Sequence, residues 1–224
     1  MNMKLWPVAE RPRERLLDAG PAGLSDAELL AVLIGTGLAG RSAVDLARAL
    51  VARFGGLTPL LEACRSGEGP LHGLGPARRA KLVAALELAR RALQESLGTR
   101  DALQSPADVK AFLRLTLQGR DRECFAVLFL DAQHRVLALE ELFSGTLTQT
   151  PVYPREIARR ALEHNAAAVI LAHNHPSGVA EPSRADEQLT QTVRAALATV
   201  DVKVLDHIVV GLGAATSFVE RGLI

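Results

Sequence analysis

The sequence has only two cysteines among its 224 residues, Cys64 and Cys124, and they stand far apart. Because no CxxC pair is present, neither a disulfide framework nor a thiolate zinc site is indicated, and a reducing cytoplasm fits this composition. Residues 1–12 contain no apolar stretch of signal-peptide length, and no run of about 18 uncharged apolar residues occurs in the chain. We therefore expect a cytoplasmic protein that does not span a membrane.

The sequence signatures of several other hydrolases are also missing. Neither HExxH nor GxSxG occurs, and the lack of CxxC argues against the zinc deaminases, whose site pairs histidine with cysteines. What the chain does contain is 48% apolar and 23% charged residues, which is the balance of a soluble globular protein. Its length admits one or two domains.

Charge is distributed unevenly between the two halves of the chain. Residues 1–100 hold 14 Lys and Arg against 10 Asp and Glu, whereas residues 101–224 hold 12 against 15. A mildly basic first half is compatible with nucleic-acid contact. So small an excess of positive charge is not by itself an argument for DNA binding.

In the first half of the sequence, residues 13–97, apolar residues recur three and four positions apart, which is typical of helices. Ser25 with the acidic residues after it predicts a capped helix through Ile34, and further helices are predicted over 41–54 and from Pro76 to about residue 97. A linker at 98–104 divides the chain into domains 1–100 and 101–224.

The second half alternates between helical and strand patterns. Two helices are predicted over 155–164 and 183–199, after a first one from Pro106 to about 117. Short apolar runs between polar turns predict strands at 124–130, 135–139, 167–172 and 202–210. The fold class is therefore α+β, an all-α domain followed by an α/β domain.

A group of potential metal ligands follows the strand predicted at 167–172. His173 and His175 are two residues apart, so both imidazoles can point to one side of a strand end. A catalytic zinc needs a third protein ligand, and Asp186 can return to them across a loop that contains Pro176, Gly178 and Pro182. Two structural alternatives remain open. The histidines could be hydrogen-bonded without a metal, and Asp186 could only cap a helix together with Ser183.

The string His173-Asn-His175-Pro-Ser-Gly, with Ser183 and Asp186, resembles the JAMM metalloprotease motif without a gap. In particular it resembles the bacterial RadC (UPF0758) proteins, and this similarity extends through 152–156 and 205–207 and over the helical half. The resemblance implies an α/β/α JAMM (MPN, cytidine-deaminase-like) domain behind a helix-hairpin-helix-like domain. It also implies Zn²⁺ held by the two histidines and Asp186.

The resemblance further implies which residues carry the chemistry. JAMM proteins have a glutamate at the start of an upstream strand, and Glu123 occupies that place as general base and acid. Ser183 matches the serine that steadies the oxyanion, or it is a plain N-cap. The competitors for the base are Glu140, Glu141 and Glu156.

For the remaining polar candidates we predict structural or orienting roles. We expect Ser177 to turn the loop, and Asp206 or His207 to hydrogen-bond the second ring nitrogen of a ligand, with a buried, satisfied His207 as the simpler alternative. Three histidines without metal-like neighbours are expected to be structural or exposed: His72, His134 and His164.

Two glycine-rich strings occur in the helical half. Gly35 to Gly40 satisfies GxGxxG, but a helix precedes it instead of a strand, which favours a glycine turn over a dinucleotide site. The string after residue 72 resembles a helix-hairpin-helix turn that contacts DNA phosphates without reading bases, or else forms a tight turn or a protein contact. The predicted phosphate contacts are Gly73, Gly75, Arg78, Arg79 and Lys81.

The sequence therefore supports three hypotheses. The first is a zinc-dependent metallopeptidase or isopeptidase that acts on a peptide or protein. The second is a DNA-associated protein or nuclease of repair or mobile elements, in which the zinc domain is regulatory. The third is a scaffold with a vestigial zinc site.

Overall fold

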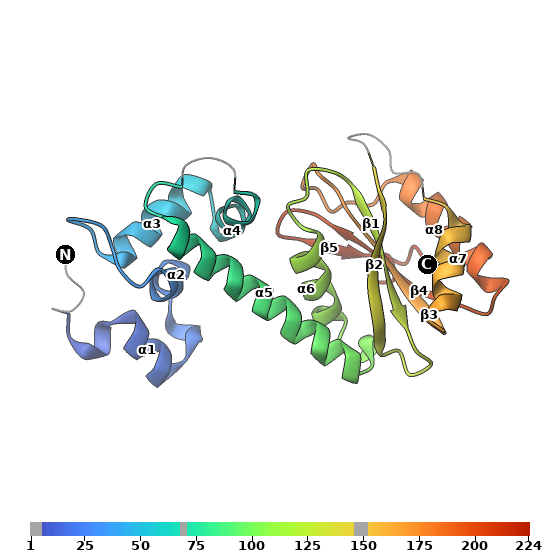
Figure 1. Ribbon diagram of the computed structural model, residues 1–224, viewed down its shortest axis with the longest axis horizontal. Helices are drawn as coiled ribbons and strands as arrows, with labels where there is room; N and C mark the ends of the chain where they lie inside the picture. Colours follow the sequence, from blue (N-terminus) through green and yellow to red (C-terminus); the bar gives the residue numbers. More distant parts are fainter. Residues whose placement is uncertain (1–5, 68–70, 146–151) are drawn as a thin grey trace. The chain divides into compact units, whose positions relative to one another are not determined.

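A computed structural model describes residues 6–67, 71–145 and 152–224. The chain divides into two compact units, a helical unit of residues 1–87 and a sheet unit of residues 88–224. The division falls inside helix α5 (Pro76–Thr99), which carries the chain from the first unit into the second (Figure 1). The predicted domain boundary at residue 100 lies at the end of this helix and stays a prediction.

The helical unit contains α-helices and short 3-10 turns, as predicted. Its helices before α5 are α1 (Pro12–Ala19), α2 (Asp26–Ile34), α3 (Ala43–Phe54) and α4 (Leu57–Ser66), with 3-10 turns at Val8–Glu10 and Pro21–Gly23. Serines cap two of these helices in capping boxes, because Ser25 accepts from the amide of Glu28 and Ser42 accepts from that of Asp45. A buried cluster of leucines and alanines from these helices forms the core of the unit.

The glycines at 35–40 lie between helices α2 and α3, so the predicted glycine turn between helices is confirmed. The turn is tight at Gly37, where an added Cβ would lie 1.9 Å from the carbonyl oxygen of Arg41. Only glycine permits this close approach of two backbone segments.

The sheet unit begins with the end of α5, a 3-10 turn at Ala102–Gln104 and helix α6 (Pro106–Leu117). A mixed sheet follows in the order β2-β1-β3-β4-β5, in which only the β3–β4 pair is parallel. Its strands are β1 (Cys124–Leu130), β2 (Val136–Ser144), β3 (Ala168–Asn174), β4 (Lys203–Val210) and β5 (Ala215–Ser217). The predicted strands are present, and the α+β class is confirmed.

Strand β2 is longer than its sequence pattern predicted. The two glutamates Glu140 and Glu141 were expected at the strand end but lie within the strand. Two consecutive glutamates interrupt the apolar alternation, and the strand continues past them because the pairing register shifts. Phe125 pairs with Phe143, whereas the next residue of β1, Ala126, pairs with Glu141. An extra residue in such a bulge moves the following side chains to the other face.

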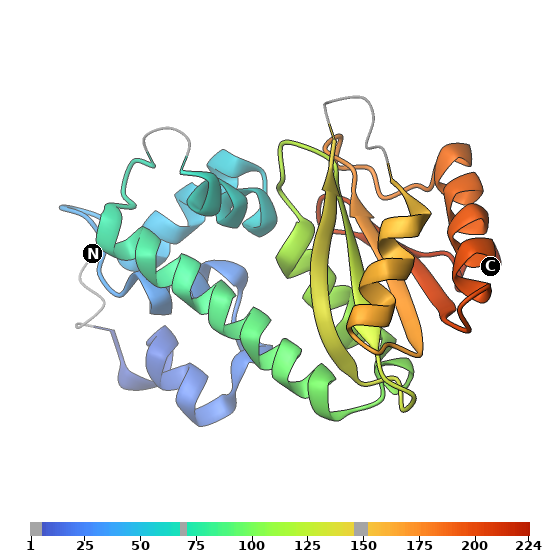
Figure 2. The ribbon, with the colours of Figure 1, turned by 45° about the vertical axis from the view of Figure 1, so that its right-hand side comes forward.

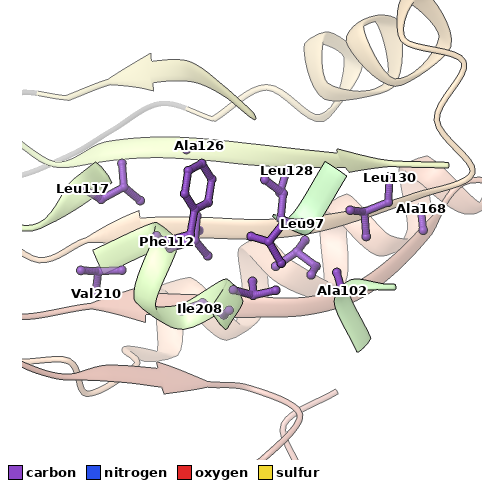
Figure 3. Close-up of a cluster of buried hydrophobic side chains, with 14 of the residues drawn as sticks. Leu97, Ala102, Phe112, Leu117, Ala126, Leu128, Leu130, Ala168, Ile208 and Val210 are labelled. Carbon is purple, nitrogen blue, oxygen red and sulfur yellow. The ribbon is translucent and has the colours of Figure 1, made fainter. Parts of the chain in front are cut away.

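Helices cover both faces of the sheet. Helix α6 packs on one face with Leu97 of α5, whereas α7 (Pro154–Glu163) and α8 (Arg184–Ala198) cover the other (Figure 2). Figure 3 shows the first core, where Phe112 and Leu117 point toward Leu128 and its neighbours on the sheet. Each such buried large side chain contributes about 1.5–3 kcal/mol, so this sandwich holds the strands rigidly.

The parallel pair β3–β4 defines the functional edge of the sheet. Both strands end there, at Asn174 and Val210, and helix α8 begins after the loop that leaves β3. Ligands of α/β sheets bind beside the carboxyl ends of parallel strands, so this edge is where a site is expected. Among the described residues, no helix is long and apolar enough to cross a membrane.

Candidate metal centre

Three potential ligands converge at the end of β3. His173 is its penultimate residue, His175 follows the strand, and Asp186 lies in the first turn of α8. Nε2 of His173 lies 3.0 Å from Nε2 of His175 and 3.3 Å from Oδ1 of Asp186, and His175 Nε2 lies 3.5 Å from Oδ2. No other group of three His, Cys, Asp or Glu side chains converges in this way within the described part of the chain.

The spacing of these atoms suits a small tetrahedral cation. Ligand atoms at about 2.0–2.1 Å from Zn²⁺ and at a tetrahedral angle lie roughly 3.3 Å apart. Nε2 of His173 lies at comparable distances from Nε2 of His175 (3.0 Å) and from Oδ1 of Asp186 (3.3 Å). Two imidazole nitrogens and one carboxylate oxygen are a donor set that Zn²⁺ accepts, with a fourth position left for water or substrate. The residues therefore fit a catalytic zinc.

The loop that returns Asp186 to the histidines depends on close backbone approach. The Leu212 amide donates to the carbonyl oxygen of Gly178 (2.7 Å), and an added Cβ at Gly211 would lie 2.4 Å from that oxygen. Gly178 also has a φ of 82°, which favours glycine. Ser177 is exposed at the bend and accepts weakly from the amide of Val179 (3.4 Å), which agrees with its predicted role in the turn.

Asp186 serves as a helix cap and faces the histidines at the same time. Ser183 is the N-cap of α8, and its amide and hydroxyl both donate to Oδ2 of Asp186 at 2.7 Å. The capping role of Asp186 is therefore compatible with its predicted role as a ligand. Because the hydroxyl proton of Ser183 is directed at Asp186, donation to a substrate oxyanion requires this hydroxyl to rotate.

A buried chain of hydrogen bonds behind His173 orients its ring. Thr190 Oγ1 donates its one proton to the carbonyl oxygen of Asp186 (2.6 Å), so it accepts from Nδ1 of His207 (2.6 Å). Burial holds the pKa of His207 well below its ordinary value, and the neutral ring then accepts at Nε2 from Nδ1 of His173 (2.8 Å). His173 is left with an unprotonated Nε2 that faces the other ligands.

His175 is oriented by the loop that follows it. Its Nδ1 donates to the carbonyl oxygen of Val179 (2.8 Å), which leaves Nε2 as the ligand atom. Two Nε2 lone pairs thus face each other at 3.0 Å beside a carboxylate, and they repel unless a cation or a proton lies between them. The prediction that His207 bonds the second ring nitrogen of a ligand agrees with this geometry, whereas the sequence did not indicate Thr190 or Val179.

The charges in this group support one another. Burial opposes the ionisation of Asp186, yet the hydrogen bonds that His173 and His175 donate when a proton occupies Nε2 outweigh it and hold the pKa of Asp186 well below its usual range. The hydrogen bond with Asp186 raises the pKa of His175, and the nearby charge of Glu123 raises it further. A positive charge is therefore favoured where the three ligand atoms meet.

Glu123 directly precedes β1, and its carboxylate acts on this centre through its charge. The antiparallel register pairs Phe125 with His173, and Glu123 lies two residues before Phe125. Residues two apart in a strand share a face, and the Phe125 ring stacks on His173 at 6.3 Å. Glu123 thus lies at the start of the strand, as predicted, and its role as the base stays a prediction.

The competing glutamates belong to ion pairs elsewhere. Glu140 binds Arg160 and accepts from His164 (2.7 Å), and hydrogen bonds from Arg160 lower the pKa of Glu140. Glu141 pairs with Arg120 at 2.5 Å, and Glu156 pairs with Arg159 at 3.0 Å.

The remaining predicted polar residues also lie outside the metal group. Asp206 accepts from Ser217 (2.6 Å) and from two backbone amides, and its burial raises its pKa. His134 pairs with Asp101 at 3.6 Å, and His72 is exposed. These findings agree with structural or exposed roles for the three histidines outside the motif.

The two arginines predicted to contact phosphates bind backbone of their own unit. Arg78 donates to the carbonyl oxygens of Gly73 (2.7 Å) and Gly37 (2.8 Å), and Arg79 donates to that of Cys64 (2.6 Å). Gly73 has a φ of 90° at the turn before α5, and Gly75 accepts from the first amides of that helix. Among the five predicted residues, Lys81 is an exposed cation. DNA contact stays a prediction.

Comparison with known proteins covers nearly the whole chain. Residues 103–223 match the family described as RadC-like JAB domain, and residues 3–80 match the family described as UPF0758 N-terminal. A UPF0758 protein of Nitrosospira multiformis is 62% identical over 100% of both chains. A UPF0758 protein of Leptothrix cholodnii is 60% identical over 99% of this chain and 100% of its own length.

Proposed function

This chain belongs to the UPF0758 family with its RadC-like JAB domain, and from that premise we propose that it is a zinc-dependent metallopeptidase or isopeptidase. Families with a JAB domain are generally hydrolytic and often depend on a metal. The observation that carries the proposal is the convergence of Nε2 of His173, Nε2 of His175 and a carboxylate oxygen of Asp186.

The residues of the centre divide the work of amide hydrolysis. A bound zinc would lower the pKa of a water ligand and polarise the substrate carbonyl. His173, His175 and Asp186 would hold the ion, and the hydrogen bonds that the two Nδ1 atoms donate to His207 and to the carbonyl oxygen of Val179 keep both imidazoles in the tautomer that binds it. These contacts are made before substrate arrives, so no reorganisation is needed during the reaction.

Glu123 would move the proton. In the proposed reaction its carboxylate takes a proton from the attacking water as the oxygen bonds to the carbonyl carbon. It then delivers that proton to the amide nitrogen as the carbon–nitrogen bond breaks, which yields a carboxylic acid and an amine. Ser183 would donate to the developing oxyanion once its hydroxyl turns away from Asp186.

The chemistry is tested with zinc-loaded wild type, Glu123→Gln and Glu141→Gln, each incubated with a denatured-peptide library and with labelled DNA. We expect Glu123→Gln to retain its zinc and to cleave peptides about 10²–10⁴-fold more slowly, because the proton acceptor is lost. Glu141→Gln makes the same change in a residue paired with Arg120 and should cleave like wild type.

The same experiment separates the alternatives. Metal-dependent cleavage of DNA alone would replace the peptidase with a nuclease, which is the DNA-associated hypothesis. Zinc binding without cleavage of either substrate would favour the scaffold. The hydrogen bonds of Arg78 and Arg79 within the helical unit leave the DNA hypothesis without support from these two side chains.

A further inference from the structure

Asn174 is a buried polar side chain that the proposed chemistry does not use. It lies between the two histidine ligands, ends β3 and is 2% exposed. Neighbouring residues in a strand project to opposite faces, so Asn174 does not present a third ligand beside His173. A buried amide needs partners for both its oxygen and its nitrogen, and those partners indicate what it does.

Both partners belong to the backbone on either side of Glu123. The amide of Cys124 donates to Oδ1 of Asn174 (2.8 Å), and Nδ2 of Asn174 donates to the carbonyl oxygen of Arg122 (3.1 Å). These are the two peptide groups that flank the Cα of Glu123. From the β2 side, the amide of Gly145 donates to the carbonyl oxygen of Glu123 itself (2.9 Å).

The sheet needs this bridge because backbone pairing stops here. The last β1–β3 backbone pair is Phe125 with His173, and the next amide of β1, that of Cys124, is bonded by the side chain of Asn174. The side chain of Asn174 therefore takes the place that the backbone of β3 vacates. A carboxamide suits the task because it offers one acceptor and one donor.

We propose that Asn174 is a positioning residue that fixes the backbone at Glu123 and so aims its carboxylate at the metal centre. One short segment of chain then carries both histidine ligands and the side chain that places the base opposite them. The inference rests on the proposed function for its catalytic meaning, whereas the two hydrogen bonds themselves are independent of it.

The first test follows amide hydrogen exchange in the zinc-free protein and needs no substrate. In Asn174→Ala the amide of Cys124 loses its acceptor, and we expect its exchange to accelerate about tenfold or more. Asn174→Asp keeps an acceptor for that amide but removes the donor to Arg122, so Cys124 should stay protected. Asn165→Asp makes the same change at an exposed turn and should leave this exchange unchanged. Unchanged exchange at Cys124 in Asn174→Ala would overturn the proposal.

The second test measures zinc content, kcat and KM. We expect Asn174→Ala to keep its zinc and its KM and to lose kcat by about 10²-fold, because a small misplacement of a catalytic group has that effect. Asn174→Asp should restore part of kcat if the bond to Cys124 is the more important one.

The double variant Glu123→Gln with Asn174→Ala distinguishes positioning from general damage. It should be no slower than Glu123→Gln alone, since Asn174 acts through Glu123. Additive losses, or loss of zinc together with activity, would make Asn174 a general structural residue and overturn the proposal. If wild type cleaves no peptide, the proposed hydrolase fails, and the exchange rates alone decide whether Asn174 holds this backbone.

Discussion

The helical unit and the sheet unit use their buried polar groups differently. In the described part of the helical unit, the buried polar residue is Ser42, a helix cap, and the half-buried arginines donate to nearby carbonyl oxygens. In the sheet unit, five buried polar residues gather at one edge of the sheet: His173, Asn174, Asp186, Thr190 and His207. Burying such groups is costly unless they bond one another.

The difference separates structural from functional polarity. In the helical unit, the cap at Ser42 and the hydrogen bonds of Arg78 and Arg79 close helix ends and turns without a further partner. In the sheet unit, the chain from Thr190 through His207 to His173 ends where two Nε2 atoms face each other at 3.0 Å beside a carboxylate, and this arrangement is completed only by a cation or a proton. Variants in both units can test this contrast.

Loss of the metal ligands should produce the largest effect. We expect wild type to bind about one zinc per chain, and the double variant His173→Ala, His175→Ala to bind almost none, since a three-ligand site would keep one ligand. Elemental analysis of the purified proteins measures this. Arg78→Lys in the helical unit should keep its full zinc content, and full retention in the double histidine variant would contradict the site.

The buried chain behind His173 should have the next largest effect. His207→Phe removes the acceptor for Nδ1 of His173, and we expect zinc affinity to fall about 10–100-fold, as measured by chelator competition. Thr190→Val should lower the zinc affinity less. It removes the acceptor that fixes the tautomer of His207, but the His207 ring stays in place. Thr192→Val removes an equivalent hydroxyl, bonded to the carbonyl of Gln188 on the same helix, and should not change the affinity.

In the helical unit we expect a smaller effect, on stability alone. Arg78→Lys keeps the charge but loses the guanidinium group that donates to the carbonyl oxygens of both Gly37 and Gly73. We expect the free energy of unfolding to fall by about 1–2 kcal/mol. Denaturant titration measures this change. Lys81→Ala removes an exposed cation of the same helix and should leave stability within about 0.5 kcal/mol of wild type. Equal losses in both variants would show that charge, not the hydrogen bonds, stabilises the turn.

The last prediction is a pH dependence confined to the sheet unit. The pKa of His175 is raised above its ordinary 6.5, and zinc binds only the neutral ring. Zinc affinity should therefore fall roughly tenfold per pH unit below that raised pKa. Without zinc the sign reverses: His175 adds stability below pH 6.5, and this contribution disappears as pH rises through the raised pKa. Zinc affinity that is constant from pH 5 to 8 would contradict this linkage.

Much of the fold followed from local patterns. The capping box at Ser25 and the apolar runs at 124–130 and 202–210 depend on neighbours in the chain, so their elements were predicted within one or two residues. Strand β2 was predicted too short because its extension depends on a bulge against β1, and short β5 had no pattern of its own.

In the candidate site, too, some features could be predicted from local sequence and others could not. By itself the sequence predicted the three candidate ligands that the structure brings together, because His173 and His175 share a strand end and Asp186 lies in the first turn of the helix that follows their loop. Only the tertiary structure decided what surrounds them. Thr190 and His207 come from α8 and β4, and the partners of Asn174 lie 50 and 52 residues away on the approach to β1. Spacing along the chain specifies contacts within one turn or strand, whereas contacts between strands exist only after the sheet has formed.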